Sequence, residues 1–225
     1  MFPVAGLTWR EAAQYTNWLH NGKQSGFDSL ITGAYDSTTW GDPGPDGYPD
    51  EEHHLPGAKF WIPTLDEWLK AAYYDPDRRG DGEGGWWLHP NGTDTPLISG
   101  LPGEGGETSG GVDLPGVGEW EIPLGAYSDV TSPWGLLDVS GGASEFTEEF
   151  GLGNIGRTYG GSFAGWEFWW FLDQNWTIGE SRPDSPSVAS GLRIASRVPG
   201  PGSLSFVVVV LLMKRRKVHQ RRRPE

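Results

Sequence analysis

Two carboxylates flank a glycine turn in the second half of the chain. Asp138 and Glu145 stand seven residues apart, with Gly141 and Gly142 between them. Ca²⁺ takes roughly six to eight hard oxygen ligands, and glycine lets a backbone turn its carbonyls toward one ion. The spacing therefore predicts a calcium loop. An ordinary glycine turn between two solvated acids is the alternative.

Cysteine chemistry is excluded because the chain of 225 residues contains no Cys. Disulfides, Cys-ligated zinc, iron–sulfur clusters and thiolate catalysis are all ruled out. The five histidines do not show the spacing of a two-His, one-carboxylate iron site. His53 and His54 are interpreted as a solvated loop pair, because adjacent side chains seldom converge on one ion.

Two further groups of residues have a chemical interpretation. Glu148 and Glu149 are an acid pair, but neighbours in a strand point to opposite faces, which disfavours glycoside cleavage. Aromatic residues crowd the segment 166–176 and could stack on sugars or hold peptides, although core packing is the commoner role.

Two helices are predicted to position these residues. Thr8 and Glu11 form a capping box that predicts a helix over 9–21, stopped by Gly22. The inward-facing candidates of this helix are Ala12, Tyr15 and Leu19.

The second capping box, Thr64 and Glu67, predicts a helix that ends at Asp75-Pro76. Residues 60–63 before it suggest a short extended segment.

The rest of the chain is predicted to be loops and short strands. Residues 24–58 and 77–118 are expected to be mostly loop, and short strands are expected beyond residue 119. The 35 Gly and 18 Pro residues disfavour long helices, whereas 13% aromatic residues argue against disorder. The expected class is α+β and loop-rich.

Charge is distributed unevenly along the chain. The net charge is -13, yet seven Lys or Arg residues and a single Glu follow residue 213. An acidic body disfavours nucleic-acid binding. Leu204–Met213 is almost wholly apolar but too short for a standard membrane span. We expect a folded domain over 1–197 and a separate tail over 198–225.

Five segments, in one order, resemble the sulfatase-modifying-factor, or formylglycine-generating-enzyme, domain family. They are residues 3–9, 61–72, 134–141, 159–163 and 191–194. The resemblance implies a loop-rich fold related to C-type lectins. It also implies that the family's N-terminal segment before the first of these blocks is missing.

The resemblance implies that the copper site of the family is lost. The two copper-binding cysteines of the family fall on Gly165 and Trp170, so copper and formylglycine generation are not expected. Ser162 and Trp166 remain candidates for the family's pocket, and Asp173 is a further candidate.

Residues 138–145 also resemble the calcium loop of this family. The implied ligands are Asp138, Gly141, Ala143 and Glu145, with Gly and Ala contributing backbone carbonyls. Candidates for the family's other calcium site are Asn91, Asp94 and Asp113.

The C-terminal tail resembles a bacterial PEP-CTERM sorting signal. Val198-Pro199-Gly200-Pro201 precedes the apolar run and the basic end, with Gly200 in place of the usual Glu. This resemblance implies export and association with the cell envelope, although no N-terminal signal is visible.

Together these features predict a non-catalytic, calcium-stabilised, exported module that binds a peptide or glycan. The alternatives are an enzyme of another reaction type, oxidoreductase-like and metal-dependent, in the same pocket, and a structural protein of the envelope.

Overall fold

A computed structural model of the chain describes residues 4–110, 121–151, 156–160, 174–175, 178–186 and 189–197. The chain divides into two units, Met1–Ala195 and Ser196–Glu225. The helices and sheets belong to the first unit, apart from the last residue of the final strand. The predicted sorting signal in residues 198–225 lies outside the described residues.

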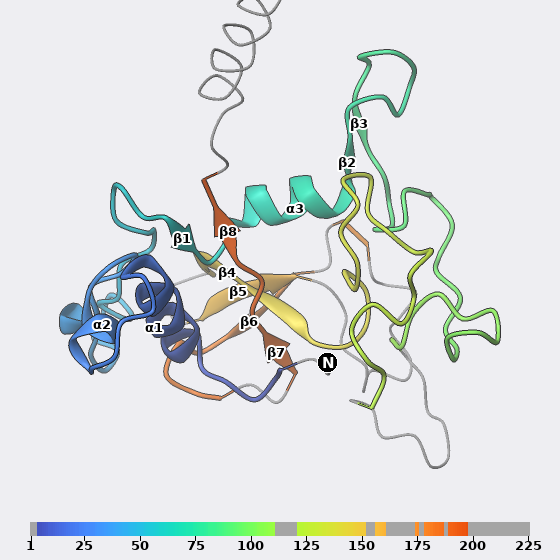
Figure 1. The fold of residues 1–225 in the computed structure, drawn as a ribbon. Coiled ribbons are helices and arrows are strands. Elements are labelled where there is room, and N and C mark those ends of the chain that lie inside the picture. Colours follow the sequence, from blue (N-terminus) through green and yellow to red (C-terminus); the bar gives the residue numbers. More distant parts are fainter. Residues whose placement is uncertain are drawn as a thin grey trace, which may run out of the picture. The chain divides into compact units, whose positions relative to one another are not determined.

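Helix α1 (Trp9–His20) begins at the predicted capping box (Figure 1). Thr8 Oγ1 accepts a hydrogen bond from the Glu11 amide at 3.0 Å, and the Glu11 carboxylate accepts one from the Thr8 amide at 2.7 Å. Two backbone donors of the first turn are thereby satisfied, which accounts for the helix start.

The prediction for the inner face of α1 is wrong at Tyr15, which is 45% exposed. The buried positions follow helical spacing from Trp9 and include the polar Asn17. Asn17 Nδ2 donates to the carbonyls of Leu30 and Tyr35 at 2.9 and 3.0 Å. An amide therefore occupies part of the face on which apolar side chains were expected, because it holds the next loop.

Two short elements interrupt the segment that was predicted to be mostly loop. They are helix α2 (Asp28–Ile31) and the 3-10 helix η1 (Ser37–Thr39). Neither contains a buried residue, so apolar periodicity could not reveal them.

Helix α3 (Leu65–Tyr73) confirms the second predicted capping box. Thr64 Oγ1 accepts from the Glu67 amide at 3.1 Å, and Glu67 Oε2 accepts from the Thr64 amide at 3.0 Å. The helix ends at Tyr73. Strand β2 (Tyr74–Asp75) follows at once and ends directly before Pro76.

The largest sheet has the strand order β6-β5-β4-β7. Strand β4 (Ser144–Phe150) pairs antiparallel with β5 (Arg157–Gly160), which pairs antiparallel with β6 (Ile178–Ser181). On its other side β4 pairs in parallel with β7 (Ser190–Gly191).

Two small sheets complete the described strands. Strand β1 (Phe60–Trp61) pairs with β8 (Ala195–Ser196), and β2 pairs with β3 (Gly85–Trp86). Short strands, few helices and many loops confirm the α+β class. No helix among the described residues is long and apolar enough to cross a membrane.

Two apolar clusters anchor this arrangement. One packs Trp9 of α1 against Tyr35, Ile62 and Phe146 of β4, and the other gathers Trp68 and neighbouring residues of α3. Strand β4 begins at the end of the Asp138–Glu145 loop, so the cores fix one end of the predicted site.

Candidate functional site

The Asp138–Glu145 loop connects the second core to strand β4. Asp138 has a left-handed φ of 56° and Gly141 a φ of 75°. Asp138 Oδ2 accepts the Gly125 amide at 2.7 Å. A Cβ at Gly141 would lie 2.5 Å from Ser109 Oγ and 2.8 Å from the Gly110 amide nitrogen. Glycine at 141 is therefore required by both backbone conformation and close packing.

The carboxylate of Glu145 is engaged by an arginine and a tryptophan. Arg193 Nη2 and Nε donate to Glu145 Oε1 at 2.6 and 3.0 Å. Trp68 Nε1 donates to Glu145 Oε2 at 2.7 Å. Glu145 is held in place by the register of β4, which places it opposite Gly191, two residues before Arg193.

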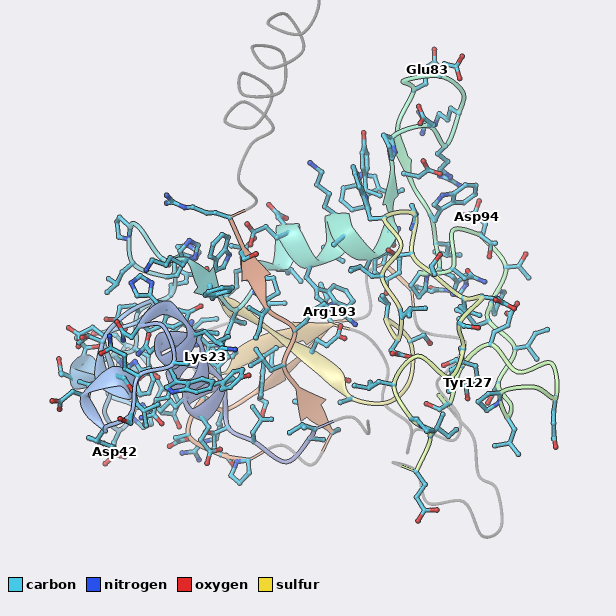
Figure 2. All side chains as sticks on the ribbon, in the orientation of Figure 1. Lys23, Asp42, Glu83, Asp94, Tyr127 and Arg193 are labelled. Carbon is cyan, nitrogen blue, oxygen red and sulfur yellow. The ribbon has the colours of Figure 1, made fainter. Side chains whose placement is uncertain are left out.

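The Arg193 side chain also binds backbone carbonyls at the start of the loop. Its Nη2 donates to the carbonyl oxygens of Leu137 and Asp138 at 3.1 and 3.3 Å. The negative charge of Glu145 raises the pKa of Arg193 above its ordinary value, so the guanidinium stays charged. Arg193, labelled in Figure 2, thus supplies a positive charge to this loop.

The donor set does not suit Ca²⁺ in this arrangement. Both oxygens of Glu145 already accept hydrogen bonds, and the Arg193 guanidinium bound to Oε1 places a positive charge where it would repel a cation. No group of three or more His, Cys, Asp or Glu side chains in the described part of the chain is placed to hold a metal ion. The calcium loop remains a prediction from sequence.

The candidates for the other calcium site have separate partners. Asp94 pairs with Arg78 at 2.5 Å and accepts the Leu88 amide at 3.1 Å. Asn91 Oδ1 accepts the Thr93 hydroxyl at 2.9 Å. Asp113 lies outside the described residues.

The candidates derived from the family's pocket also lie outside the described residues. These are Ser162, Gly165, Trp166, Trp170 and Asp173. The aromatic segment 166–176 is described only at residues 174–175.

Two adjoining cavities lie beside the loop, and we call them together the groove. The first, about 350 Å³, is lined by the loop residues Asp138 and Glu145 and by Arg193. The second, about 570 Å³, is lined mostly by apolar residues, among them Leu7, Tyr15 and Ile194, and also by Glu11. The cavities share Val4, Leu124 and Leu192.

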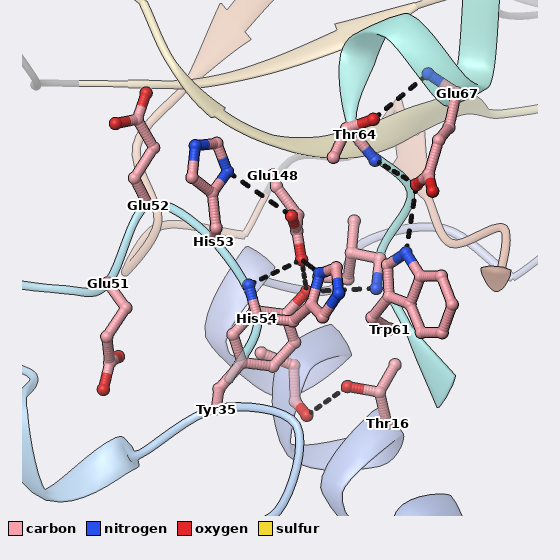
Figure 3. A network of polar contacts seen from close by, with 12 residues as sticks. Thr16, Tyr35, Glu51, Glu52, His53, His54, Trp61, Thr64, Glu67 and Glu148 are labelled. Atoms are coloured by element: carbon pink, nitrogen blue, oxygen red, sulfur yellow. Dashed lines mark hydrogen bonds and ion pairs between the residues drawn. The ribbon is translucent and has the colours of Figure 1, made fainter. Parts of the chain in front are cut away.

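Sequence reasoning missed a buried carboxylate network centred on Glu148 (Figure 3). The side chain of Glu148 has no exposed surface. Its Oε1 accepts from the Tyr35 hydroxyl at 2.6 Å and from the His54 amide at 2.9 Å. Burial and the charge of Glu148 raise the pKa of Tyr35 well above its ordinary value, so the phenol stays a donor.

The interpretation of His53 and His54 as a solvated pair holds for His53, whose side chain is 59% exposed, and is wrong for His54, whose side chain is 25% exposed and packed against Glu148. His54 Nδ1 lies 2.8 Å from Glu148 Oε1, and His53 Nδ1 lies 3.5 Å from Glu148 Oε2. The His54 ring bonds one carboxylate oxygen of Glu148, whereas Oε2, the oxygen nearer His53, accepts no hydrogen bond among the described residues. His54 also stacks on Trp61, with ring centroids 4.6 Å apart.

Glu149, the neighbour of Glu148, contacts different groups. Glu149 Oε2 accepts the Leu65 amide at 2.6 Å at the start of α3, and burial raises the pKa of this carboxyl group. The contacts of the two acids differ as strand alternation predicts, which agrees with the doubt about a glycosidase pair.

Arg157 on β5 is buried beside this network. Its guanidinium lies 3.7 Å from the ring centroids of both Trp9 and Phe150 and donates to the carbonyls of Glu51, Glu52 and Glu148. Burial lowers its pKa to about 10, which still leaves it charged at neutral pH. The network therefore joins the loop before β1 to the main sheet.

Comparison with known proteins identifies a fold and not a family. No family model matches the chain, and no curated protein matches it. The solved structure described as the crystal structure of CarF is 17% identical, with a TM-score of 0.55, over 87% of this chain and 68% of that one. Treponema denticola variable protein 1 is 18% identical, with a TM-score of 0.54, over 88% of this chain and 72% of that one.

These likenesses show a shared fold. At such identities they carry no activity or ligand across to this chain. The resemblance to the formylglycine-generating-enzyme family stays a prediction from the five sequence segments.

Proposed function

We propose that this chain is a non-catalytic binding module that holds a peptide segment in the groove. The observation that carries the proposal is the composition of the groove walls: one cavity is lined mostly by apolar side chains and the other contains a charged guanidinium. A cavity of a few hundred cubic ångströms with few polar groups is typical of a ligand site.

The described walls of the groove lack the residues for nucleophilic catalysis. They contain no Ser, Thr, Cys, His or Lys. Asp138 and Glu145 are the acids of the first cavity and Glu11 is the acid of the second, and all three accept hydrogen bonds within the protein. An activated nucleophile with an adjacent base is therefore missing from these walls.

Arg193 provides the polar contact for a ligand. Within the described residues its Nη1 atom donates no hydrogen bond, whereas Nε and Nη2 are engaged. Because Asp138 and Glu145 are negative, a neutral carbonyl suits this donor better than a second carboxylate. Peptide carbonyls have this chemistry.

The apolar cavity provides the contact for a side chain. Tyr15 is 45% exposed and Leu124 is 44% exposed, so both present apolar surface at the wall. Burying one Leu, Phe or Met side chain here contributes about 1.5–3 kcal/mol. A peptide segment with one large apolar side chain matches both cavities.

Selection from a displayed random heptapeptide library on the full-length protein tests the proposal. We expect enrichment of peptides with a large apolar residue and their loss in the Tyr15→Ala variant. Phe27→Ala is the matched control, because Phe27 is 70% exposed and does not line the groove. No enrichment, or equal loss in both variants, would contradict the proposal.

A further inference from the structure

A projecting hairpin carries the sequence Arg79-Gly80-Asp81 near its tip. Strands β2 and β3 pair with Tyr74 opposite Trp86 and Asp75 opposite Gly85. The connecting residues 76–84, which we call the tip loop, extend away from helix α3, with Glu83 near the end (Figures 1 and 2). Residues 79–83 are all exposed.

The backbone of the tip loop is fixed by hydrogen bonds of its own. The Gly80 amide donates to the Asp77 carbonyl at 3.0 Å, and the Glu83 amide donates to the Gly80 carbonyl at 2.9 Å. The Arg79 amide donates to the Glu83 carbonyl at 3.0 Å, and the Gly82 amide donates to Asp77 Oδ1 at 2.8 Å. The loop is therefore preorganised, which lowers the entropy lost on binding.

Glycine between the arginine and the aspartate is required by the backbone. Gly80 has a φ of 124°, a conformation that residues with a Cβ rarely adopt. A Cβ at this position would meet no atom within 4 Å. The surface above Gly80 is therefore open to an approaching partner.

Two charged side chains of the hairpin, Asp75 on β2 and Arg78 in the tip loop, are used for structure. Arg78 pairs with Asp94 at 2.5 Å and lies 4.4 Å from the centroid of the Trp87 ring. Asp75 Oδ2 accepts the Trp87 indole N–H at 3.0 Å. These contacts tie the hairpin base to the body of the first unit.

The exposed charged side chains nearer the tip, Arg79, Asp81 and Glu83, are not used in this way. Among the described residues their side chains form no hydrogen bond or ion pair. The tip loop thus presents a guanidinium and a carboxylate, one glycine apart, with which no side chain in the described part of the chain pairs.

We propose that this tip loop is a second binding site, independent of the groove, for a receptor that holds a divalent cation beside an acidic pocket. The Asp81 carboxylate would complete the oxygen shell of the receptor's cation, which takes carboxylate ligands and exchangeable waters. The Arg79 guanidinium would pair with a receptor carboxylate through parallel N–H donors. Gly80 allows the receptor surface to approach the backbone between them.

Surface binding of the full-length protein to a purified Arg-Gly-Asp-dependent integrin tests this proposal. We expect binding in Mn²⁺ that is lost with EDTA and competed by a soluble Arg-Gly-Asp peptide. Asp81→Glu keeps the charge but moves the carboxylate by one methylene, and it should weaken binding about tenfold or more.

Glu83→Gln is the matched control, because Glu83 lies in the same loop and is equally without a partner. Its binding should equal that of the wild type. Both variants change exposed side chains, so the melting curve should not move in either. Absence of Mn²⁺-dependent binding in the wild type, or full binding by Asp81→Glu, would overturn the proposal.

Discussion

Replacing Arg193 with Met tests whether this arginine is the cation that holds the Asp138–Glu145 loop. The change leaves Glu145, whose side chain is 9% exposed, with Trp68 as its remaining described donor. Removing one partner of a buried ion pair costs about 3–5 kcal/mol. Because the Arg193 side chain is 27% exposed, we expect the lower end, about 3 kcal/mol.

Thermal unfolding followed by circular dichroism measures this loss. At about 2–4 °C per kcal/mol for a domain of this size, Arg193→Met should lower Tm by about 6–12 °C. Adding Glu145→Gln should cost less than the sum of the two single changes, because they remove the same interaction.

Arg182→Met is the control for the Arg193 variant. Arg182 pairs with Asp184 at 3.3 Å and donates to the Tyr48 hydroxyl at 2.8 Å, but its side chain is 61% exposed, so solvent screens the pair and the change should lower Tm much less than Arg193→Met does. Equal losses for Arg182→Met and Arg193→Met, or strict additivity with Glu145→Gln, would refute the reasoning.

Three further predictions concern the same unit. Gly141→Ala should lower the free energy of unfolding, measured in urea, by more than about 2 kcal/mol, because a Cβ there meets Ser109 and the Gly110 backbone. In the control Gly135→Ala the Cβ meets no atom within 4 Å, so the loss should be only about 1 kcal/mol. Tyr35→Phe removes a donor to Glu148 and the acceptor of a backbone amide; we expect a loss of about 2–4 kcal/mol by calorimetry, and an unchanged Tm would contradict the buried network. Exchange of Ca²⁺ for EDTA should leave the wild-type Tm unchanged, and a calcium-dependent rise would restore the calcium loop predicted from sequence.

Local signals in the sequence predicted local structure well. Each capping box places a hydroxyl and a carboxylate three residues apart, so both partners are visible in the sequence. The helices at Trp9 and Leu65 therefore start where the sequence predicts. Glycine and proline content likewise indicated the loop-rich α+β class.

The site depends on partners that are far apart in the chain, which a single sequence does not reveal. Arg193 meets Glu145 across 48 residues, and Tyr35 meets Glu148 across 113. The pairing of β4 with β7 brings the first pair together, and the packing of the segment between α2 and η1 against β4 brings the second together. The adjacent His53 and His54 give no sign of their shared partner.

The two proposed binding sites fail or succeed separately. The groove depends on Tyr15 and Arg193, whereas the tip loop depends on Arg79 and Asp81. A variant that loses peptide binding should keep receptor binding, and the reverse also holds.

Isothermal titration of the full-length protein with a peptide selected from the library tests the central claim most directly. We predict saturable binding with a negative heat-capacity change, as apolar burial requires, unchanged in Phe27→Ala and weakened about tenfold or more in Tyr15→Ala. Equal affinity of the wild type and Tyr15→Ala would contradict the assignment of the groove as the binding site.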